Sequence, residues 1–296
     1  MRNKFLELIK NPNKLFSHIL SFISPLLSDR IYIILRYWNR TDNFPNLNNP
    51  QSFNEKLQWL KLNNRNPLYT KLVDKNLVKD HVSKIIGNDF IIKTLKVYNN
   101  PDEINYEELP DKFVMKCTHD SGGIIICKDK KNIDKNSISR KLNKNLKKNF
   151  YLWGREWPYK NVEKKIIVEE FIDNYSEDIK DYKFFCFDGE PKFLKVDYDR
   201  FKNHRANYYD LDWNLLTYGE KVCPPDFNHV EEKPDNFDLM IEIVKKLSKG
   251  FPFIRVDLYN VKGKIYFGEL TFFPASGMGK WIEPEQDLEI GKFLKL

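Results

Sequence analysis

Two acidic residues near the C-terminal end of the chain could bind a metal ion. The segment FIRVDLYNVKGKIYFGELTFF is typical of two strands joined by a turn around residues 260–263. If Asp257 pairs with Phe267, Glu269 is its diagonal neighbour on the same face, about 7–8 Å away. In that register Arg255 lies opposite Glu269. Two such carboxylates can share one Mg²⁺, and the alternative is an exposed strand face with an Arg255–Glu269 pair.

A lysine and a glycine-rich loop follow each other in KFVMKCTHDSGGIIICK. Lys116 is on the first strand, and the loop contains His119, Ser121, Gly122 and Gly123. Glycines let backbone N–H groups approach phosphate oxygens, and a lysine supplies positive charge. The lysine precedes the glycines, so this is not a Walker A loop. A plain hairpin turn, with a hydrogen-bonding histidine, is the alternative.

Two acids end the apolar strand in KKIIVEEFI. Glu169 and Glu170 could be solvated caps of the strand, or they could hold an adenine amine and ribose hydroxyls by charge-assisted hydrogen bonds. The following segment YKFFCFDGEPKF predicts a hairpin with its turn at 188–189. Lys183 lies on the first arm of this hairpin.

The composition is typical of a globular protein, and its charged residues are unevenly distributed along the sequence. Its 296 residues suggest two domains or lobes, at roughly 150 residues each. The four cysteines form no CxxC pair, which argues against a disulfide framework or a zinc knuckle and favours a reducing cytoplasm. The net charge is +7, but residues 128–165 alone carry 13 Lys/Arg and 4 Asp/Glu. Charge so confined argues against a nucleic-acid-binding face.

The basic segment has two interpretations. It could be a solvated helix at about 137–150 followed by a polar linker. It could also recognise an anionic glycan, since it contains Arg155, which could bind a carboxylate, and aromatic residues such as Trp157 that could stack on sugar rings.

The N-terminal region predicts amphipathic helices. Its uncharged stretch 15–28 is interrupted by Pro25 and is shorter than the ~20 apolar residues that cross a bilayer. These helices either pack on the main body or contact a membrane surface through an apolar face surrounded by lysines and arginines. The second alternative would put the protein at the inner face of the membrane.

Further helices are expected over 52–65, where Ser52 and Glu55 fit a capping box, and over 71–86 and 237–249. Short β-branched and aromatic runs from residue 90 onward predict mostly antiparallel strands, so the fold class is α+β. We expect a helical region over 1–88, a first β lobe over 89–175 and a second over 176–296.

Taken in their order along the chain, these segments resemble the ATP-grasp superfamily. They most closely resemble its TupA-like branch, which is linked to teichuronopeptide and surface-polysaccharide synthesis. The resemblance covers roughly residues 45–280. It rests on FNEKLQWLKL, NPLYTKLVDK, SGGIIICKDK, FDGEPKF and FPFIRVDLYNVKGKIYFGELTF. It implies an ATP-grasp fold, with antiparallel sheets that sandwich the nucleotide and a mainly helical region before them.

The resemblance also implies roles for particular residues. ATP would be bound by Lys75, Lys116, Ser121, Gly122, Gly123, Glu169, Glu170, Phe171, Ile172, Glu177 and Asp178. The metal ligands would be Asp257, Glu269 and Thr271, the last at the position of the usual asparagine. Catalysis would involve Arg255 and Lys183. The substrate would contact Arg155, Trp157 and His119.

The implied reaction is an ATP- and Mg²⁺-dependent carboxylate–amine ligation through an acylphosphate. The branch suggests amidation of a uronic acid in capsule, O-antigen or another surface polysaccharide. A rival interpretation is a glycosyltransferase of the same pathway, for which Asp197-Tyr198-Asp199 matches a DxD metal motif literally. A non-catalytic polysaccharide-binding protein is the third alternative.

Overall fold

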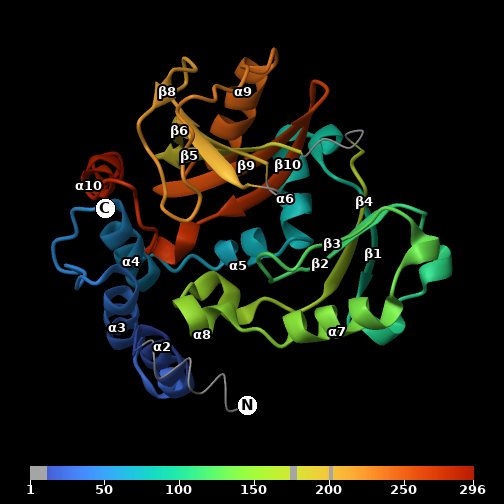
Figure 1. Cartoon of the computed structure of the whole chain (residues 1–296), viewed down its shortest axis with the longest axis horizontal. Coiled ribbons are helices and arrows are strands. Elements are labelled where there is room, and N and C mark those ends of the chain that lie inside the picture. The colour runs from blue at the N-terminus through green and yellow to red at the C-terminus, as the bar shows by residue number, and fades with distance from the viewer. Residues whose placement is uncertain (1–11, 174–178, 200–202) are drawn as a thin grey trace.

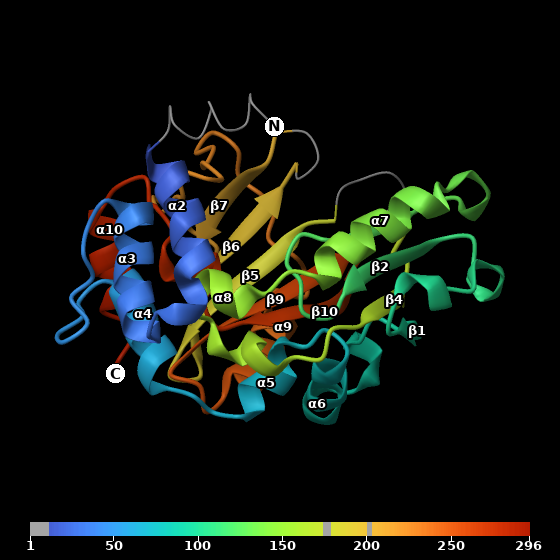
Figure 2. The same cartoon turned by 90° about the horizontal axis from the view of Figure 1, so that it is seen from below.

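Two antiparallel sheets form the frame of the molecule (Figure 1). The computed structural model describes residues 12–173, 179–199 and 203–296. Within these residues the fold is α+β with the antiparallel strands expected from the sequence. A turned view shows helices α2 (Pro12–Ile23), α3 (Asp29–Thr41) and α4 (Phe53–Asn63) grouped beside one end of the larger sheet, with the smaller sheet on the other side (Figure 2).

The smaller sheet has the strand order β1-β4-β2-β3 and is antiparallel throughout. Its strands are β1 (Thr94–Tyr98), β2 (Phe113–Cys117), β3 (Ile125–Cys127) and β4 (Ile166–Glu170). The alternating burial of β2 directs Phe113, Met115 and Cys117 into a core of its own, against Leu142 of helix α7 (Lys135–Leu146). The intervening Lys116 therefore points to the opposite face.

The larger sheet has the order β10-β9-β5-β6-β7-β8. Its strands are β5 (Asp181–Phe187), β6 (Glu190–Tyr198), β7 (Arg205–Tyr209), β8 (Leu215–Leu216), β9 (Phe253–Val261) and β10 (Lys264–Thr271). On one face Phe184 stacks on Phe237 of helix α9 (Phe237–Ser248), with ring centroids 5.9 Å apart. On the other face Phe53 of helix α4 (Phe53–Asn63) packs on Phe187 and Phe253.

Both hairpins predicted from the sequence form. Residues 188–189 connect β5 to β6, and residues 262–263 connect β9 to β10. Positive φ angles at Asp188 and Gly189, and again at Lys262 and Gly263, give the tight turns that such two-residue loops require.

The helix expected over 71–86 is interrupted. Helix α5 (Leu68–Val73) ends before Asp74, which is extended, and helix α6 (Leu77–Ile86) follows. The Asp74 carboxylate accepts hydrogen bonds from the backbone N–H groups of Asn76 and Leu77, at 2.8 and 3.0 Å. This local capping bond replaces a continuous helix and leaves Lys75 in the break.

The basic segment also contains two helices instead of one. Helix α7 ends at Leu146, and helix α8 (Phe150–Gly154) starts after Asn149, whose side chain caps it. The other α-helices are α2 (Pro12–Ile23), α3 (Asp29–Thr41) and α10 (Glu285–Gly291). The 3₁₀ helices are η1 (Ser24–Leu26), η2 (Asn88–Phe90), η3 (Pro101–Glu103), η4 (Tyr106–Glu108), η5 (Lys130–Asn132), η6 (Trp157–Asn161) and η7 (Pro274–Gly277).

The described residues contain two large hydrophobic cores. The larger one combines helices α4, α5 and α6 with the six-stranded sheet, for example through Leu57, Leu72 and Val82. The smaller one belongs to the four-stranded sheet. Helices α4 to α6 therefore do not form a separate unit from the second β lobe, in contrast to the division expected from the sequence, because their apolar faces are buried against that lobe.

The capping box of α4 gives a stability prediction. The Ser52 hydroxyl accepts the Glu55 backbone N–H at 3.3 Å, and the Glu55 carboxylate accepts that of Ser52 at 3.2 Å. Replacing Ser52 with alanine should lower the free energy of unfolding by about 1 kcal/mol, measured by urea denaturation. The control is Ser137→Ala, at an exposed position of α7. Equal stability of the two variants would contradict this role.

Candidate functional site

The hairpin of β9 and β10 brings together the predicted metal-binding residues, but in a different register from the expected one. Asp257 lies directly opposite Glu269, and Arg255 lies opposite Thr271. The expected pairing of Asp257 with Phe267 is wrong. The two-residue turn at 262–263 pairs Phe267 with Leu258, and a bulge at Gly268 then shifts the register by one further residue, so Glu269 pairs with Asp257. A side chain at Gly268 would place its Cβ 2.9 Å from the Asp257 carbonyl oxygen, so glycine permits this close approach.

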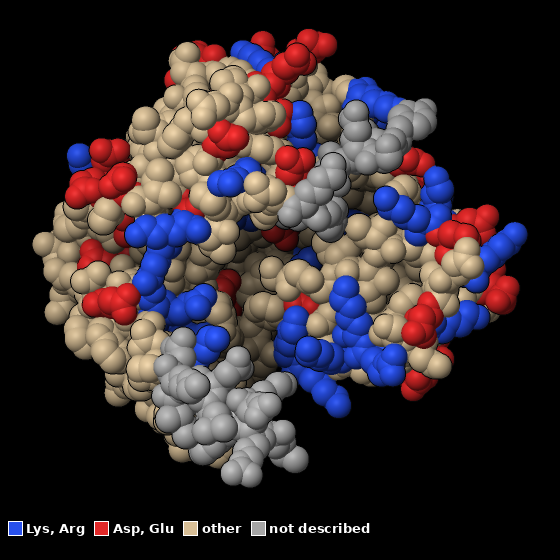
Figure 3. Space-filling model, viewed as in Figure 1, with Lys and Arg blue, Asp and Glu red and all other residues tan. Residues whose placement is uncertain are grey.

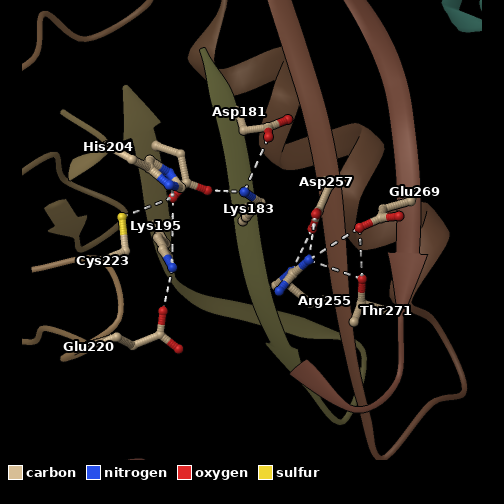
Figure 4. A network of polar contacts seen from close by, with 11 residues as sticks. Asp181, Lys183, Lys195, His204, Glu220, Cys223, Arg255, Asp257, Glu269 and Thr271 are labelled. Carbon is tan, nitrogen blue, oxygen red and sulfur yellow. Dashed lines mark hydrogen bonds and ion pairs between the residues drawn. The ribbon is translucent and has the colours of Figure 1, made fainter. Parts of the chain in front are cut away.

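A single guanidinium group lies where the predicted metal ligands converge. Arg255 donates two hydrogen bonds to the Asp257 carboxylate, at 2.7 and 2.6 Å. Its Nη2 also lies 3.1 Å from the Thr271 hydroxyl and 3.4 Å from a Glu269 oxygen (Figure 4). Three side chains with hard oxygen donors thus surround one cation. Mg²⁺ prefers such ligands, so these residues fit a magnesium site.

The charges on this hairpin are coupled. Burial raises the pKa of Asp257 to about 6, although Arg255 opposes the shift. Partial burial also disfavours the Glu269 carboxylate, but Lys75, Arg255 and Lys183 hold the pKa of Glu269 below its ordinary value. The position is therefore suited to a carboxylate that stays ionised near several cations.

Lys183 lies beside the hairpin on the next strand. It pairs with Asp257 of β9 on one side and with Lys195 of β6 on the other. Its ammonium contacts Asp181 at 3.2 Å and forms an ion pair with Asp197 (Figure 4). A row of charged side chains thus crosses the sheet next to the possible metal site.

The smaller sheet provides a second cluster of charges. Glu169 of β4 lies between Lys116 of β2 and Lys79 of α6, with both ion pairs at 2.6 Å. Burial opposes its ionisation, but these two lysines hold the pKa of Glu169 below its usual range. The carboxylate is thus engaged by two cations, and its ion pair with Lys116 fixes the direction of that side chain.

The other predicted nucleotide-contacting residues are only partly described. Glu170 is exposed at the end of β4, and Phe171 and Ile172 are half-buried directly after it. Glu177 and Asp178 lie outside the described residues.

The glycine-rich loop between β2 and β3 is held from both sides. Lys75 donates a hydrogen bond to the Asp120 carbonyl oxygen, and Lys148 pairs with the Asp120 carboxylate at 3.2 Å. Gly122 has a φ of 78°, and a Cβ at Gly123 would lie 2.1 Å from an Asp120 oxygen. The positive φ favours glycine at Gly122, and a side chain at Gly123 would displace the Asp120 and Asn145 side chains. Ser121 is exposed.

Lys75 connects this loop to the metal-binding hairpin. Burial lowers the pKa of Lys75, but the Glu269 charge opposes this shift more strongly than any other charged group does. The Lys75 ammonium, between α5 and α6, is therefore near enough to Glu269 of β10 for the two charges to stabilise each other. Figure 3 shows a hollow between the lobes with lysine and arginine side chains around it and carboxylates inside.

Arg155 lies in a different environment from the expected substrate site. Its guanidinium is buried against the N-terminal helices, donates to the Ser24 hydroxyl at 3.0 Å and pairs with Asp29 at 3.0 Å. It also stacks over the Tyr32 ring, with 4.3 Å between the guanidinium carbon and the ring centroid. These contacts anchor η1 and α3 to α8, so the expected binding of a substrate carboxylate by Arg155 is not supported.

The other two expected substrate residues are also engaged inside the protein. Trp157 donates to the Asn64 carbonyl oxygen at 3.1 Å. His119 is buried beside Phe150, and burial lowers the pKa of its imidazole. The Trp157 indole is therefore held by the backbone, whereas both ring nitrogens of His119 are buried without a hydrogen-bond partner among the described residues.

Sequence reasoning missed Lys79, although it lies one helical turn after Lys75 and could have been considered with it. It also missed the polar group around Asp197, which was noted only as part of a DxD motif. Asp197 is buried and paired with Lys183, whereas Asp199 is exposed after the end of β6. The two aspartates do not form the paired metal site that a glycosyltransferase would need.

Comparisons with solved structures give distant similarities. D-alanine–D-alanine ligase from Bacillus anthracis, solved with ATP, is 15% identical over 68% of this chain, with a TM-score of 0.39. The Helicobacter pylori ligase is 15% identical and covers 83% of this chain and 70% of its own, with a TM-score of 0.42. An L-amino acid ligase from Bacillus licheniformis is 14% identical and covers 76% and 49%, with a TM-score of 0.43.

This chain spans 54% of the length of the Bacillus anthracis enzyme. The substrates of these enzymes are therefore not carried over to it. No curated protein matches the sequence.

A family comparison is more specific. The family described as TupA-like ATPgrasp matches residues 55–295. This range is most of the chain, and it contains both sheets, the glycine-rich loop and the β9–β10 hairpin. The chain belongs to the TupA-like ATP-grasp family.

Proposed function

We propose that the protein is an ATP-dependent carboxylate–amine ligase. ATP phosphorylates a carboxylate, and an amine then displaces phosphate from the acylphosphate to form an amide. The observation that carries this proposal is the convergence of Asp257, Glu269 and Thr271 on one cation position, opposite the lysines of the smaller lobe. Family membership supports it.

ATP and Mg²⁺ are the cofactors of this family. Asp257, Glu269 and Thr271 would hold the metal ion, which when bound neutralises charge on the phosphoryl group. The chain's own residues supply the rest. Lys116, oriented by Glu169, and Lys183 bind phosphate oxygens, and Arg255 stabilises negative charge at the transferred group. The glycine loop offers backbone N–H groups and excludes water.

The substrate class follows from the family branch and from charge. We infer a carbohydrate carboxylate, such as a uronic acid of a surface polysaccharide, and an amino acid or other amine. Exposed lysines of the basic segment support an anionic acceptor, since Lys141 and Lys144 lie on α7 near the glycine-rich loop and Lys147 directly follows this helix. Lys141 donates to the carbonyl oxygen of Ile124 at 2.7 Å, so this helix adjoins the loop directly.

The test is ADP release by the full chain with Mg²⁺ and ATP, in a matrix of uronic acids and amines. Release that needs both a carboxylate and an amine supports the ligase. A glycosyltransferase remains the rival, and a nucleotide sugar that competes with ATP for binding would favour it. ATP binding without turnover in any combination would favour a polysaccharide-binding role.

The first activity prediction concerns Glu269. Glu269→Gln removes a negative charge from the metal position, so ADP release should fall below detection while the chain stays folded by circular dichroism. The matched control is Glu242→Gln, at an exposed position of α9. Near-normal ADP release by folded Glu269→Gln would remove this residue from the metal site.

The second concerns the phosphate-binding lysines. A hydrogen bond to a charged group contributes about 1.5–3 kcal/mol, so Lys116→Met and Lys183→Met should each weaken ATP binding about tenfold or more in calorimetry. Adenosine binding should change less, because adenosine has no phosphate. Lys112→Met is the control, since Lys112 pairs with Asp173 on the surface. Unchanged ATP affinity in both test variants would refute the assignment.

We also infer that the N-terminal helices contact an anionic membrane surface at its cytoplasmic face. Among the described helices, none is long and apolar enough to span a bilayer. However, Phe22 and Leu26 are 87% and 86% exposed at the end of α2 and in η1. Lys14, Arg30 and Arg40 on α2 and α3 are exposed as well, which suits acidic lipid headgroups.

Vesicle co-sedimentation tests this contact. The double variant Phe22→Asp/Leu26→Asp should bind phosphatidylglycerol vesicles at least about tenfold less, because burying each side chain contributes roughly 1.5–3 kcal/mol. Val222→Asp is the control, at a residue that is 83% exposed outside these helices. Equal binding by wild type and the double variant, or no binding by wild type, would exclude the contact.

A further inference from the structure

A carboxylate, an imidazole and a thiol meet on the larger sheet away from the β9–β10 hairpin. Asp197 is in β6, His204 directly precedes β7, and Cys223 lies in the segment after β8. One ligand atom from each lies within 4.8 Å of the other two. The Asp197 Oδ1 atom is 3.0 Å from His204 Nε2 and 3.8 Å from Cys223 Sγ (Figure 4).

The burial of these groups suits a bound ion with one open side. Asp197 and Cys223 are 2% and 3% exposed, whereas the His204 side chain is 38% exposed. Zn²⁺ is commonly held by cysteine, histidine and carboxylate ligands, and sites with three protein ligands keep a fourth position for water. Mg²⁺ prefers oxygen ligands and would not select this set.

The surrounding charges favour a divalent cation. Asp197 pairs with Lys183 and Lys195, and those lysines pair in turn with Asp181 and Glu220. Among the described residues this group contains three carboxylates and two ammonium groups, and a metal-bound Cys223 would be a thiolate. A divalent cation would therefore neutralise this buried group of charges.

We propose that Asp197, His204 and Cys223 bind Zn²⁺ at a site separate from the magnesium position. Asp197 is in β6 and Asp257 in β9, with β5 between them, so the two positions are about 10 Å apart at the usual strand spacing. The bound ion would fasten the segment after β8 to the sheet next to Lys183. The proposal depends on these ligand atoms and not on the ligase reaction.

The ligands come from three separate segments of the chain, which is why the absence of a CxxC pair does not exclude this site. A sequence search detects zinc ligands mainly when they are closely spaced. Here β6 and β7 bring His204 to Asp197, and the return of the chain after β8 brings Cys223.

Co²⁺ serves as the probe, because a Co²⁺–thiolate bond gives a near-ultraviolet charge-transfer band. The metal-free full-length protein is titrated with Co²⁺ in excess Mg²⁺, which occupies the oxygen-ligand site. We expect one Co²⁺ per chain, a thiolate band, the intense visible bands of tetrahedral Co²⁺, and displacement by Zn²⁺. Cys223→Ser should abolish the thiolate band, whereas Cys127→Ser, at a buried thiol in β3, should retain it.

His204→Gln keeps the test decisive if Cys223→Ser does not fold, because His204 is partly exposed. Since loss even of an outer-shell partner costs about 10–100-fold in metal affinity, removal of this ligand should weaken Co²⁺ binding more than about tenfold. No thiolate band in wild type would overturn the proposal. A band that persists in Cys223→Ser, or an unchanged Co²⁺ affinity in His204→Gln, would overturn it as well.

Discussion

The buried pairing of Asp257 with Arg255 is the interaction on which the site depends. A carboxylate held inside a sheet costs several kcal/mol unless a cation and hydrogen bonds compensate for it. Arg255 provides both, through two hydrogen bonds from the same strand. The guanidinium is thereby directed toward Glu269 and Thr271 on β10. One ion pair thus determines where a phosphate or a metal ion finds complementary charge.

Much of this arrangement could be predicted from local sequence. Short β-branched and aromatic runs identified the strands, and turn residues identified both hairpins. The residue types in the β9–β10 hairpin suggested a metal site. The register could not be obtained in the same way, because the bulge depends on contact between Gly268 and the Asp257 backbone on the partner strand. An isolated glycine in a strand is a signal for such a bulge, but it does not define which residues pair.

The sequence did not reveal the contacts of Arg155 and Glu169, because both residues pair with side chains that are distant in the sequence. Arg155 is held by Ser24 and Asp29, more than 120 residues earlier in the chain. Glu169 is neutralised by Lys79 from another lobe. Nothing near either residue indicates these contacts. A charged side chain can form an ion pair that joins two parts of the fold, or it can bind a ligand. Which of these it does depends on the tertiary structure.

Glu169 has a mechanical consequence. Lys79 belongs to a helix packed in the larger core, whereas Glu169 and Lys116 belong to the smaller sheet. The carboxylate therefore joins the smaller sheet to helix α6 of the larger core. Separating the two sheets would leave the buried Glu169 with one counter-ion fewer, at a cost of several kcal/mol. The hydrogen bond from Lys75 to the Asp120 carbonyl oxygen joins the glycine-rich loop to the same helical region, so two contacts restrain the smaller sheet beside the site.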